Sequence, residues 1–395
     1  MVMQFYETLP ETQKESYRKF IGIIGSLSRL FSENNSPYFD SRIAENIFCK
    51  CFKAENLARD DSTADAKIGS IGIGIKTWVG DAGAQKIAEF NKSKNEYGHL
   101  NGLDKVRKIA ELRNARIDFT LRQYGLSKMI YHVTIREPGF IKILECPLEK
   151  IDVDNLSVLS ETDKSIQFTD GKNHYNFYIS KSVLLMKFDK LVEKDRVSVS
   201  IFSNPYKLLE ETFGVSNTDS LENLETGLAG LYGEPENPFI YLKLYSYRDR
   251  KTYDKFVPEK SGLNQWNAGG RPRNQDEIYI PISREDHKRS PHFFPDRDSP
   301  FTLILPDGKT ISAKVCQDNS KALMSNPNSD LGKWLLREVL RLKPGTLVDY
   351  RLFIYIGIDS VRIEKLSDEV YKINFAKLDS YENWMSGYRD EDVED

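Results

Sequence analysis

Residues 261–282 read SGLNQWNAGGRPRNQDEIYIPI, a polar loop with a glycine pair that leads directly into a short alternating apolar segment. Arginine side chains pair well with guanine edges, and asparagine or glutamine side chains pair with adenine edges. Gly269 and Gly270 allow the backbone to approach another molecule closely. The alternation over 277–282 predicts a strand, so amide and guanidinium groups are expected beside the start of that strand.

The surroundings of this loop read as a β domain. A hairpin is indicated at Asp307-Gly308, and one amphipathic helix is predicted over 332–342. The predicted strands are 239–246, 277–282, 301–305, 310–315, 346–353, 360–365 and 370–375. Several short strands with one helix predict a barrel-like architecture. A second polar loop, CQDNSKALMSNPNSDLG at 316–332, follows one of these strands. By composition alone, either loop is also explained as an ordinary turn.

From about Phe239 to Tyr381 the chain resembles the B3-like DNA-binding domain at the C-terminus of certain prokaryotic restriction endonucleases. The blocks that carry the resemblance are SGLNQWNAGGRPRN, EIYIPI, FFPDRDSPFTLILPDGK, KVCQDNSKALMSNPN, LGKWLLREVL and GIDSVRIEK. The resemblance implies an all-β B3-like pseudobarrel whose two arms enter the major groove of double-stranded DNA. It implies that the loops at 264–274 and 317–328 are these arms. The DNA-binding residues expected are Asn264, Gln265, Trp266, Asn267, Arg271, Arg273, Asn274, Lys321, Ser325, Asn326 and Asn328.

The N-terminal half contains a second informative stretch, ADAKIGSIGIGIKTWVGDAGAQKIAEF at 64–90. Hydrolysis of a phosphodiester needs carboxylates for Mg²⁺, and a nearby lysine can stabilise the charge that develops on the phosphate. Asp65 and Lys76 supply such groups, with Lys76 near the end of a predicted buried strand. A short helix is predicted around Gln85–Glu89. Its glutamate, Glu89, is expected to reach into an open space beside Gly74.

This stretch resembles variant PD-(D/E)xK nucleases, the EcoRII-like enzymes among them, in which the second metal-binding acid lies on the helix after the strand. That family places an acid at the start of a hairpin and the lysine on the next strand. The resemblance makes Asp65 and Glu89 the metal ligands and Lys76 the catalytic lysine. Glu45, on a helix predicted from residue 41, becomes the helix glutamate of the catalytic set. Mg²⁺ is the cofactor that the resemblance implies.

The short motif departs from the family in two places. Ala64 stands where the family has proline, and Gly74 stands where it has the central acid. A rival assignment is also present, because Lys67 follows Asp65 in a D-x-K pattern that would take Asp60 or Asp61 as its first acid. Lys76 is preferred because a buried apolar strand precedes it, whereas Lys67 is predicted to lie in a polar turn.

Bulk properties agree with a DNA-binding enzyme of the cytoplasm. The 395 residues are 39% apolar and 29% charged with a net charge of −3, and no apolar run is long enough to span a membrane. The four cysteines are too few and too scattered for a disulfide framework or a zinc site. Residues 243–297 nevertheless contain twelve basic and eight acidic residues, which is compatible with a nucleic-acid partner.

The sequence therefore predicts an α/β (α+β) restriction-nuclease-like domain at 1–215, a linker at 216–237 and a B3-like domain with an acidic tail at 238–395. The function expected is that of a type II restriction endonuclease, with a cognate DNA methyltransferase in the cell and a homodimer as a candidate assembly. One alternative is a sequence-specific DNA-binding protein whose N-terminal half is a non-catalytic dimerisation or effector domain. Another is a modification-dependent nuclease.

Overall fold

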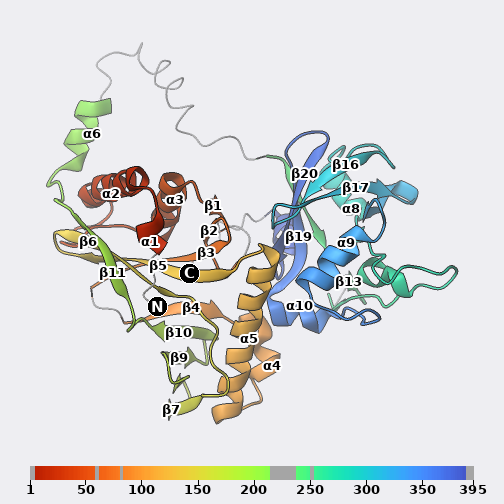
Figure 1. Cartoon of the computed structure of the whole chain (residues 1–395), viewed down its shortest axis with the longest axis horizontal. Helices are drawn as coiled ribbons and strands as arrows, with labels where there is room; N and C mark the ends of the chain where they lie inside the picture. The colour runs from red at the N-terminus through yellow and green to blue at the C-terminus, as the bar shows by residue number, and fades with distance from the viewer. Residues whose placement is uncertain (1–4, 58–61, 81–82, 214–236, 250–252, 388–395) are drawn as a thin grey trace.

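The computed structural model describes residues 5–57, 62–80, 83–213, 237–249 and 253–387. All but the last residue of the expected linker at 216–237 lies outside these ranges, and so do Asp60 and Asp61. Figure 1 shows two parts side by side, an N-terminal half with two sheets and a C-terminal half built around a third.

The first sheet of the N-terminal half holds the Asp65–Lys76 segment. Its six strands run in the order β1-β2-β3-β5-β6-β11. Their bounds are β1 Glu55–Asn56, β2 Ala66–Ile68, β3 Ile71–Val79, β5 Lys128–Glu137, β6 Phe140–Pro147 and β11 Val192–Ser198. β2 and β3 form an antiparallel hairpin, whereas β3 and β5 are parallel. A parallel pair needs a long crossover, and the chain between β3 and β5 includes helix α5 (Gly102–Gln123).

Helices cover one face of this sheet (Figure 1). They are α1 (Phe5–Thr8), α2 (Glu11–Ser26) and α3 (Ser41–Phe52), with a 3-10 turn η1 at Ser28–Leu30. The helix predicted from residue 41 is confirmed, because the Asp40 carboxylate caps it by accepting the backbone N–H of Ile43 at 2.8 Å. Apolar residues of α2 and α3 pack with Ile73 and Ile75 of β3 in one buried cluster.

The opposite face packs on α5 and on a second, five-stranded antiparallel sheet in the order β4-β10-β9-β8-β7. Its strands are β4 Ala84–Glu89, β10 Val183–Lys187, β9 His174–Tyr178, β8 Ser165–Thr169 and β7 Ser157–Glu161. The helix expected around Gln85–Glu89 is wrong. β4 pairs with β10 from Val183↔Glu89 onward, and these ladder hydrogen bonds to a distant strand outweigh the local helical pattern.

Three short helical segments complete the described part of the N-terminal half. They are η2 (Asn91–Ser93), α4 (Lys94–Tyr97) and α6 (Pro205–Phe213). None of the described helices is long and apolar enough to cross a membrane.

A seven-stranded sheet forms the C-terminal half, in the order β12-β19-β20-β16-β17-β18-β15. Its strands are β12 Phe239–Lys243, β19 Ile358–Lys365, β20 Val370–Lys377, β16 Pro300–Ile304, β17 Thr310–Cys316, β18 Ala322–Ser325 and β15 Ile280–Pro281. The outermost strands β12 and β15 lie next to each other, so the sheet is a nearly closed barrel. The predicted barrel and its hairpin at Asp307-Gly308 are confirmed. A small ladder, β13 (Ser246–Tyr247) with β14 (Lys255–Phe256), lies beside it.

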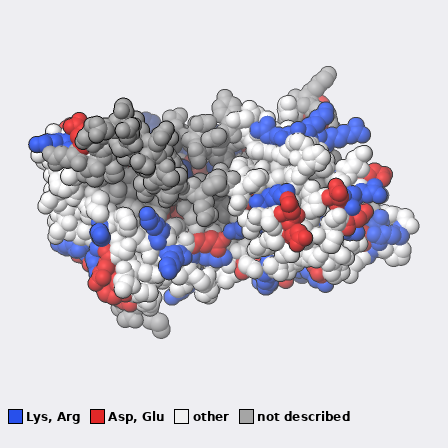
Figure 2. Space-filling model, turned by 90° about the horizontal axis from the view of Figure 1, so that it is seen from above, with Lys and Arg blue, Asp and Glu red and all other residues white. Residues whose placement is uncertain are grey.

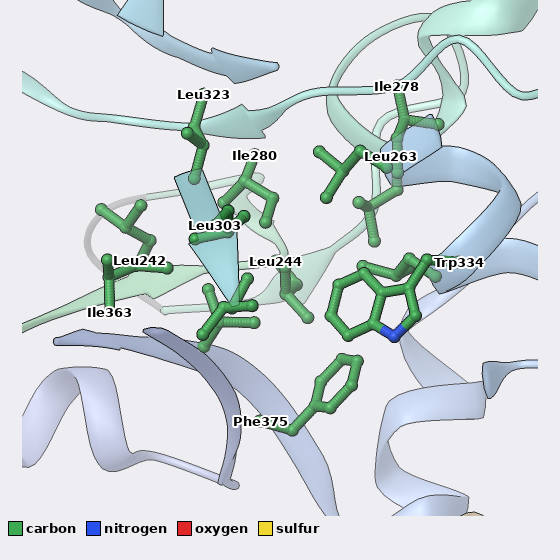
Figure 3. Packing of buried hydrophobic residues seen from close by; sticks show 14 of the residues in the cluster. Leu242, Leu244, Leu263, Ile278, Ile280, Leu303, Leu323, Trp334, Ile363 and Phe375 are labelled. Carbon is green, nitrogen blue, oxygen red and sulfur yellow. The ribbon is translucent and has the colours of Figure 1, made fainter. Parts of the chain in front are cut away.

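The barrel interior is filled by apolar side chains from strands far apart in the sequence (Figure 3). Leu242, Leu303 and Ile363 are each fully buried, and each contributes about 1.5–3 kcal/mol by leaving water. Trp334 stacks on Phe375 with ring centroids 5.4 Å apart and closes one end of this core.

Short helices lie around the barrel, and the helix predicted at 332–342 is among them. They are η3 (Gly262–Asn267), α8 (Arg284–Arg289), η4 (Asp318–Ser320), α9 (Asp330–Gly332), the π-helical η5 (Lys333–Val339), α10 (Tyr350–Ile356) and α11 (Ser380–Ser386). The strand predicted at 346–353 is wrong, because its second half begins α10. The Asp349 carboxylate caps that helix by accepting the N–H of Leu352 at 2.9 Å, and Gly357, with a φ of 88°, ends it.

The two halves pack directly on each other through α5. Phe119 of α5 is buried in the barrel core, where its ring meets Phe375 edge-on at 5.2 Å between centroids. Lys372 of β20 pairs with Glu55 of β1 at 2.9 Å. The helix that crosses from β3 to β5 therefore also anchors the barrel.

Candidate active site and nucleic-acid interface

The β2–β3 hairpin fixes the position of Asp65. Strand pairing ends at Ala66↔Ile73, and the N–H of Asp65 donates to the carbonyl of Ile73 at 2.8 Å. Beyond that point the Asp65 carboxylate takes the place of a partner strand, because its Oδ2 accepts the N–H of Ile75 at 2.6 Å. The carboxylate is thus held against β3, next to Lys76.

Glu45, Asp65 and Lys76 form one electrostatic cluster. Burial raises the pKa of Asp65, while the Lys76 ammonium, the N–H of Ile75 and the Arg113 guanidinium act in the opposite direction. Burial raises the pKa of Glu45 to about 7, the charge of Asp65 adds to that rise, and Lys76 opposes it. Helix α3 and strand β3 therefore bring together the helix glutamate, the first acid and the lysine expected from the sequence.

The same turn of α3 adds a thiol to this cluster. Cys49 lies four residues after Glu45, so the two side chains share a face of the helix. Burial raises the pKa of the Cys49 thiol to about 12, and the charges of Glu45 and Asp65 contribute to the rise. The thiol remains protonated at neutral pH, so the carboxylates are the groups in this cluster suited to a hard cation.

The residues present fit a magnesium ion. Mg²⁺ is usually bound by one or two carboxylates together with water and substrate phosphate oxygens, and Asp65 and Glu45 supply two carboxylates. The pKa of Glu45 is raised mainly by burial and further by the charge of Asp65, and a divalent cation beside the two carboxylates would offset both effects.

Gly74 does not leave an open space beside Lys76, as the sequence had suggested. A Cβ built on Gly74 would lie 3.1 Å from Leu148 Cδ1 and 3.1 Å from Tyr131 Cδ1. The Tyr131 hydroxyl in turn accepts a hydrogen bond from the buried Arg113 guanidinium at 3.0 Å. An acid at this position would collide with a packed aromatic ring, so Gly74 serves close packing.

Glu89 lies apart from the cluster. It ends β4 in the second sheet, where its carboxylate pairs with Lys86 at 2.6 Å and accepts a hydrogen bond from the Asn91 amide. The hydrogen bond from Lys86 lowers the pKa of Glu89. Within the described residues, no hydrogen bond or ion pair joins Glu89 to Asp65 or Lys76. The assignment of Glu89 as a metal ligand depended on a helix around Gln85–Glu89, and this segment is a strand.

The rival lysine, Lys67, is engaged elsewhere. Its ammonium pairs with Glu55 at 3.2 Å and donates to the carbonyl of Pro306 at 3.1 Å, at the contact between the two halves. It also lies over the ring of Tyr124. These contacts favour Lys76 as the lysine of the site.

A second group of acids could also hold a metal ion by geometry. Among the described residues, the carboxylates of three acids lie close together: Asp359, Asp379 and Glu382. The ammonium of Lys255 already pairs with these three at 2.8, 2.6 and 3.0 Å respectively. The lysine occupies the position that a cation would take, so this group is an ion-pair network within the C-terminal half.

The first expected arm, residues 264–274, begins with a structural residue. Asn264 is 1% exposed; its Nδ2 donates to the carbonyls of Pro258 at 3.0 Å and Val348 at 2.9 Å, and its Oδ1 accepts the N–H of Val348 at 2.9 Å. Its expected role as a DNA-binding residue is corrected, because the whole amide is used to fix the base of the arm. Trp266 likewise packs partly buried against the barrel core.

Glu277 organises the two arginines of this arm. The Arg271 guanidinium makes a two-point pair with the buried Glu277 carboxylate, with one contact at 3.1 Å, and remains half-exposed. Arg273 pairs with Glu277 at 3.6 Å and donates to the carbonyl of Ala268 at 2.6 Å, so little of its side chain reaches solvent. The Arg271 side chain is therefore accessible to a ligand, whereas the Arg273 side chain is largely buried and stabilises the loop.

The remaining polar residues of the first arm face outward. Asn267 and Asn274 are exposed, and Gln265 is partly exposed. The Asn267 amide donates to the carbonyl of Glu259 at 3.0 Å, and the Asn274 side chain accepts the N–H of Asp276 at 2.9 Å, which forms a tight turn.

The second expected arm, residues 317–328, contains another buried member. Ser325 is fully buried, and its hydroxyl accepts the N–H of Leu331 at 2.8 Å, so its expected role as a DNA-binding residue is also corrected. Lys321, Asn326 and Asn328 are exposed. The buried and the exposed residues of this arm differ in their position relative to β18 (Ala322–Ser325). Ser325 is the last residue of the strand, whereas the exposed residues lie before or after it.

The two arms are connected through neighbouring strands of the barrel. β15, which follows the first arm, pairs with β18 in the middle of the second arm at Ile280↔Leu323. The Arg337 guanidinium donates to Asp276 Oδ1 at 2.7 Å and ties the first arm to η5. Figure 2 shows lysine and arginine side chains along one edge of the C-terminal half, with basic and acidic side chains intermixed over the rest of the visible face.

Residues 243–355 match the family described as the NgoFVII C-terminal B3-like DNA-binding domain. The barrel half is similar to a restriction-enzyme DNA-binding domain. The match begins in β12 and ends in α10, so it contains both arms and the strands β15, β16, β17 and β18, and it ends before β19 and β20. No curated protein matches the chain.

Proposed function

We propose that this protein is a type II restriction endonuclease that reads double-stranded DNA with its C-terminal domain and cuts it with its N-terminal half. The observation that carries the proposal is the family match over residues 243–355 in a chain that also brings Glu45, Asp65 and Lys76 together at a β-hairpin. An acid at the start of a hairpin, a lysine on the next strand and a glutamate on a preceding helix form the arrangement expected of PD-(D/E)xK nucleases.

Asp65 and Glu45 are the residues that would hold Mg²⁺ in this site. A bound Mg²⁺ would supply an activated water and neutralise charge on the phosphate. Asp65 is preorganised for binding because the N–H of Ile75 fixes its carboxylate. Lys76 orients the attacking water and stabilises the negative charge that develops on the phosphate oxygens.

For DNA reading, the exposed members of the two arms are the proposed contacts. These are Gln265, Asn267, Arg271, Asn274, Lys321, Asn326 and Asn328. Arg271 can face a guanine edge or a phosphate because Glu277 orients its guanidinium. A cognate methyltransferase that protects host DNA, and a homodimer that cuts both strands, belong to the same proposal.

Cleavage of phage DNA with and without Mg²⁺ tests the nuclease assignment. We expect discrete fragments with Mg²⁺ and none with a chelator. Lys76→Ala and Asp65→Asn should each lower the cleavage rate by about 100-fold or more, since each removes a group that acts on the transition state. Glu89→Gln is the matched control and should retain cleavage; its loss would restore the displaced-glutamate assignment.

A wild-type protein that binds a specific DNA sequence but cuts it with no divalent metal would contradict the nuclease proposal. It would instead support the sequence-specific DNA-binding protein with a non-catalytic N-terminal half. Digestion of methylated and unmethylated plasmid side by side tests the third candidate, because a modification-dependent nuclease would cut only the methylated DNA.

A further inference from the structure

A polar pocket of about 290 Å³ opens on the N-terminal half at the carboxyl ends of β3 and β5. Its wall is the loop between η1 and α3, which contributes Asn34, Asn35, Ser36 and Tyr38, and its floor is Arg136. Asn34 and Asn35 are exposed, so their amide groups stand at the rim. The lining offers hydrogen-bond donors around one guanidinium group.

Among the described residues, the Arg136 guanidinium has no hydrogen-bond or ion-pair partner. It lies at the end of β5 opposite Val79 and is partly buried, and its Nε is fully buried without a hydrogen bond. Within the described residues its side chain makes no ion pair either. Burial lowers the pKa of Arg136, with Tyr38 and Asp40 acting in the opposite direction. A half-buried guanidinium with an unsatisfied donor is costly, and an anionic ligand would offset that cost.

Other buried arginines of this protein are partnered. Arg113 donates to the hydroxyl of Tyr131 at 3.0 Å, and Arg337 donates to the carboxylate of Asp276 at 2.7 Å. Arg116 and Arg273 share with Arg136 a buried Nε without a hydrogen bond, but each donates through another guanidinium nitrogen, to the carbonyls of Glu89 and Ala268 respectively, both at 2.6 Å. Among the described residues, the Arg136 guanidinium makes no such bond.

The pocket borders the candidate active site. Asp40, which caps α3, interacts electrostatically with both Glu45 and Arg136. The Thr77 hydroxyl, one residue after Lys76, donates to the carbonyl of Phe39 at 3.0 Å and so fastens the pocket loop to β3. A DNA strand at the Glu45–Asp65–Lys76 cluster would pass close to Arg136.

We propose that Arg136 and the Asn34–Ser36 loop bind a phosphate of the DNA backbone adjacent to the cleavage position. This inference rests on the proposed nuclease function. Arginine binds phosphate through two parallel hydrogen bonds, and half to two-thirds of protein–DNA hydrogen bonds reach phosphate or sugar. The contact would position the strand over the catalytic cluster without reading its sequence, whereas the arms of the barrel supply the specificity.

The test is equilibrium binding of the full-length protein to a duplex in the presence of chelator, over a range of salt concentrations. Arg136→Gln should weaken binding by about tenfold, the value of one charge-assisted hydrogen-bond pair. It should also reduce the slope of log affinity against log salt by about 0.9, the contribution of one phosphate contact. The loss should be the same for specific and unrelated duplexes.

Lys142→Gln is the matched control. Lys142 lies on the neighbouring strand β6 and carries the same charge, but its ammonium is already paired with Glu137 at 2.6 Å. An equal effect of the two substitutions, or an unchanged salt slope in Arg136→Gln, would overturn the proposal. Arg136→Lys should recover part of the affinity, because it restores the charge without the two-point geometry.

Stability separates a binding role from a structural one. Removing an unpartnered guanidinium should leave the melting temperature of Arg136→Gln unchanged or raised, and a lowered value together with lost binding would overturn the proposal. The double variant Asn34→Asp/Asn35→Asp changes only exposed rim residues and should weaken binding further by repulsion. Wild-type affinity in that double variant would also count against the pocket.

Inorganic phosphate distinguishes a DNA phosphate from a free one. If the pocket served free phosphate, wild-type protein would bind it and Arg136→Gln would lose that binding with DNA affinity unchanged, which overturns the DNA version. Because these measurements are made without a divalent metal, they do not depend on cleavage. A protein that never cuts DNA would refute the nuclease function while the Arg136 contact is still tested by binding.

Discussion

At the scale of single residues, Glu45 has the clearest pH signature. Its pKa rises from an ordinary 4.5 to about 7 because the side chain is partly buried and faces the Asp65 carboxylate. Between these two pH values the folded protein holds the Glu45 proton more tightly than the unfolded chain does. The free energy of unfolding therefore falls as the pH rises through this window, and the ionised site is a source of strain.

Glu45→Gln should consequently stabilise the metal-free protein at pH 8 by about 1–2 kcal/mol, after allowance for the part of the side chain that stays in water. At pH 5 the variant and the wild type should differ little, because Glu45 is then protonated in the folded state. Urea denaturation at both pH values in chelator measures the difference. Added Mg²⁺ should narrow the gap at pH 8 by binding the folded wild type. A difference independent of pH would contradict the assignment.

Asn264 is a polar residue of the first arm whose burial gives it a structural role instead of the expected DNA-binding role. Asn264→Ala should lower the free energy of unfolding by about 2–3 kcal/mol, since it leaves buried partners at Pro258 and Val348 without hydrogen bonds. Thermal denaturation checks this, with the exposed neighbour Asn267→Ala as control. Full stability of Asn264→Ala with selective loss of DNA binding would return Asn264 to the reading surface.

At the scale of elements, strand β3 explains why the nuclease motif is incomplete. The family's central acid would stand at Gly74, where Tyr131 and Leu148 already fill the space. The proposed catalytic acids are instead Asp65, just before β2, and Glu45 on α3. The glycine- and isoleucine-rich run at 72–77 predicted this strand correctly, and the strand extends it to Ile71–Val79.

Gly74→Asp, which restores the family motif, should therefore not increase cleavage. We expect a loss of stability of about 1–3 kcal/mol from overpacking alone, with a further cost for the buried charge. Gly74→Ala should be milder, because Leu148 and Tyr131 need to move only slightly for a single methyl group. Urea denaturation together with cleavage assays measures both; a stable and more active Gly74→Asp would show that the space is available.

At the scale of the whole molecule, α5 makes the two halves one structural unit. It covers the first sheet on one side and inserts Phe119 into the barrel core on the other. The ion pair between Lys372 and Glu55 adds a second contact between the halves. Under the proposed function, this fixed arrangement lets both halves contact the same stretch of DNA.

Phe119→Ala should destabilise the whole protein by about 3–5 kcal/mol, the usual cost of emptying a buried aromatic site. Because the side chain belongs to one half and packs in the other, we expect a single unfolding transition at lower temperature in calorimetry. The exposed Phe31→Ala is the control and should have little effect. Two separate transitions, with only the barrel affected, would show that the halves fold independently.

The sequence by itself determined the elements whose signal is local. The hairpin at Asp307-Gly308, helix α3, the strands β12, β16, β17, β19 and β20, and the similarity of the barrel half to a DNA-binding domain were predicted from pattern and motif, whereas β18 and α10 were not. Local sequence carries this information because turn chemistry, helix caps and side-chain periodicity act between residues a few positions apart.

Only the tertiary structure decided which of these elements meet. β4 is a strand because β10, more than ninety residues later, pairs with it, and that pairing carries Glu89 into another sheet. Glu45 joins Asp65 because α3 packs on β3, and Asn264 is buried because Val348 lies against it. Such contacts depend on the packing of distant segments, which no short stretch of sequence specifies, and they determine which residues remain available for the proposed contacts with metal and DNA.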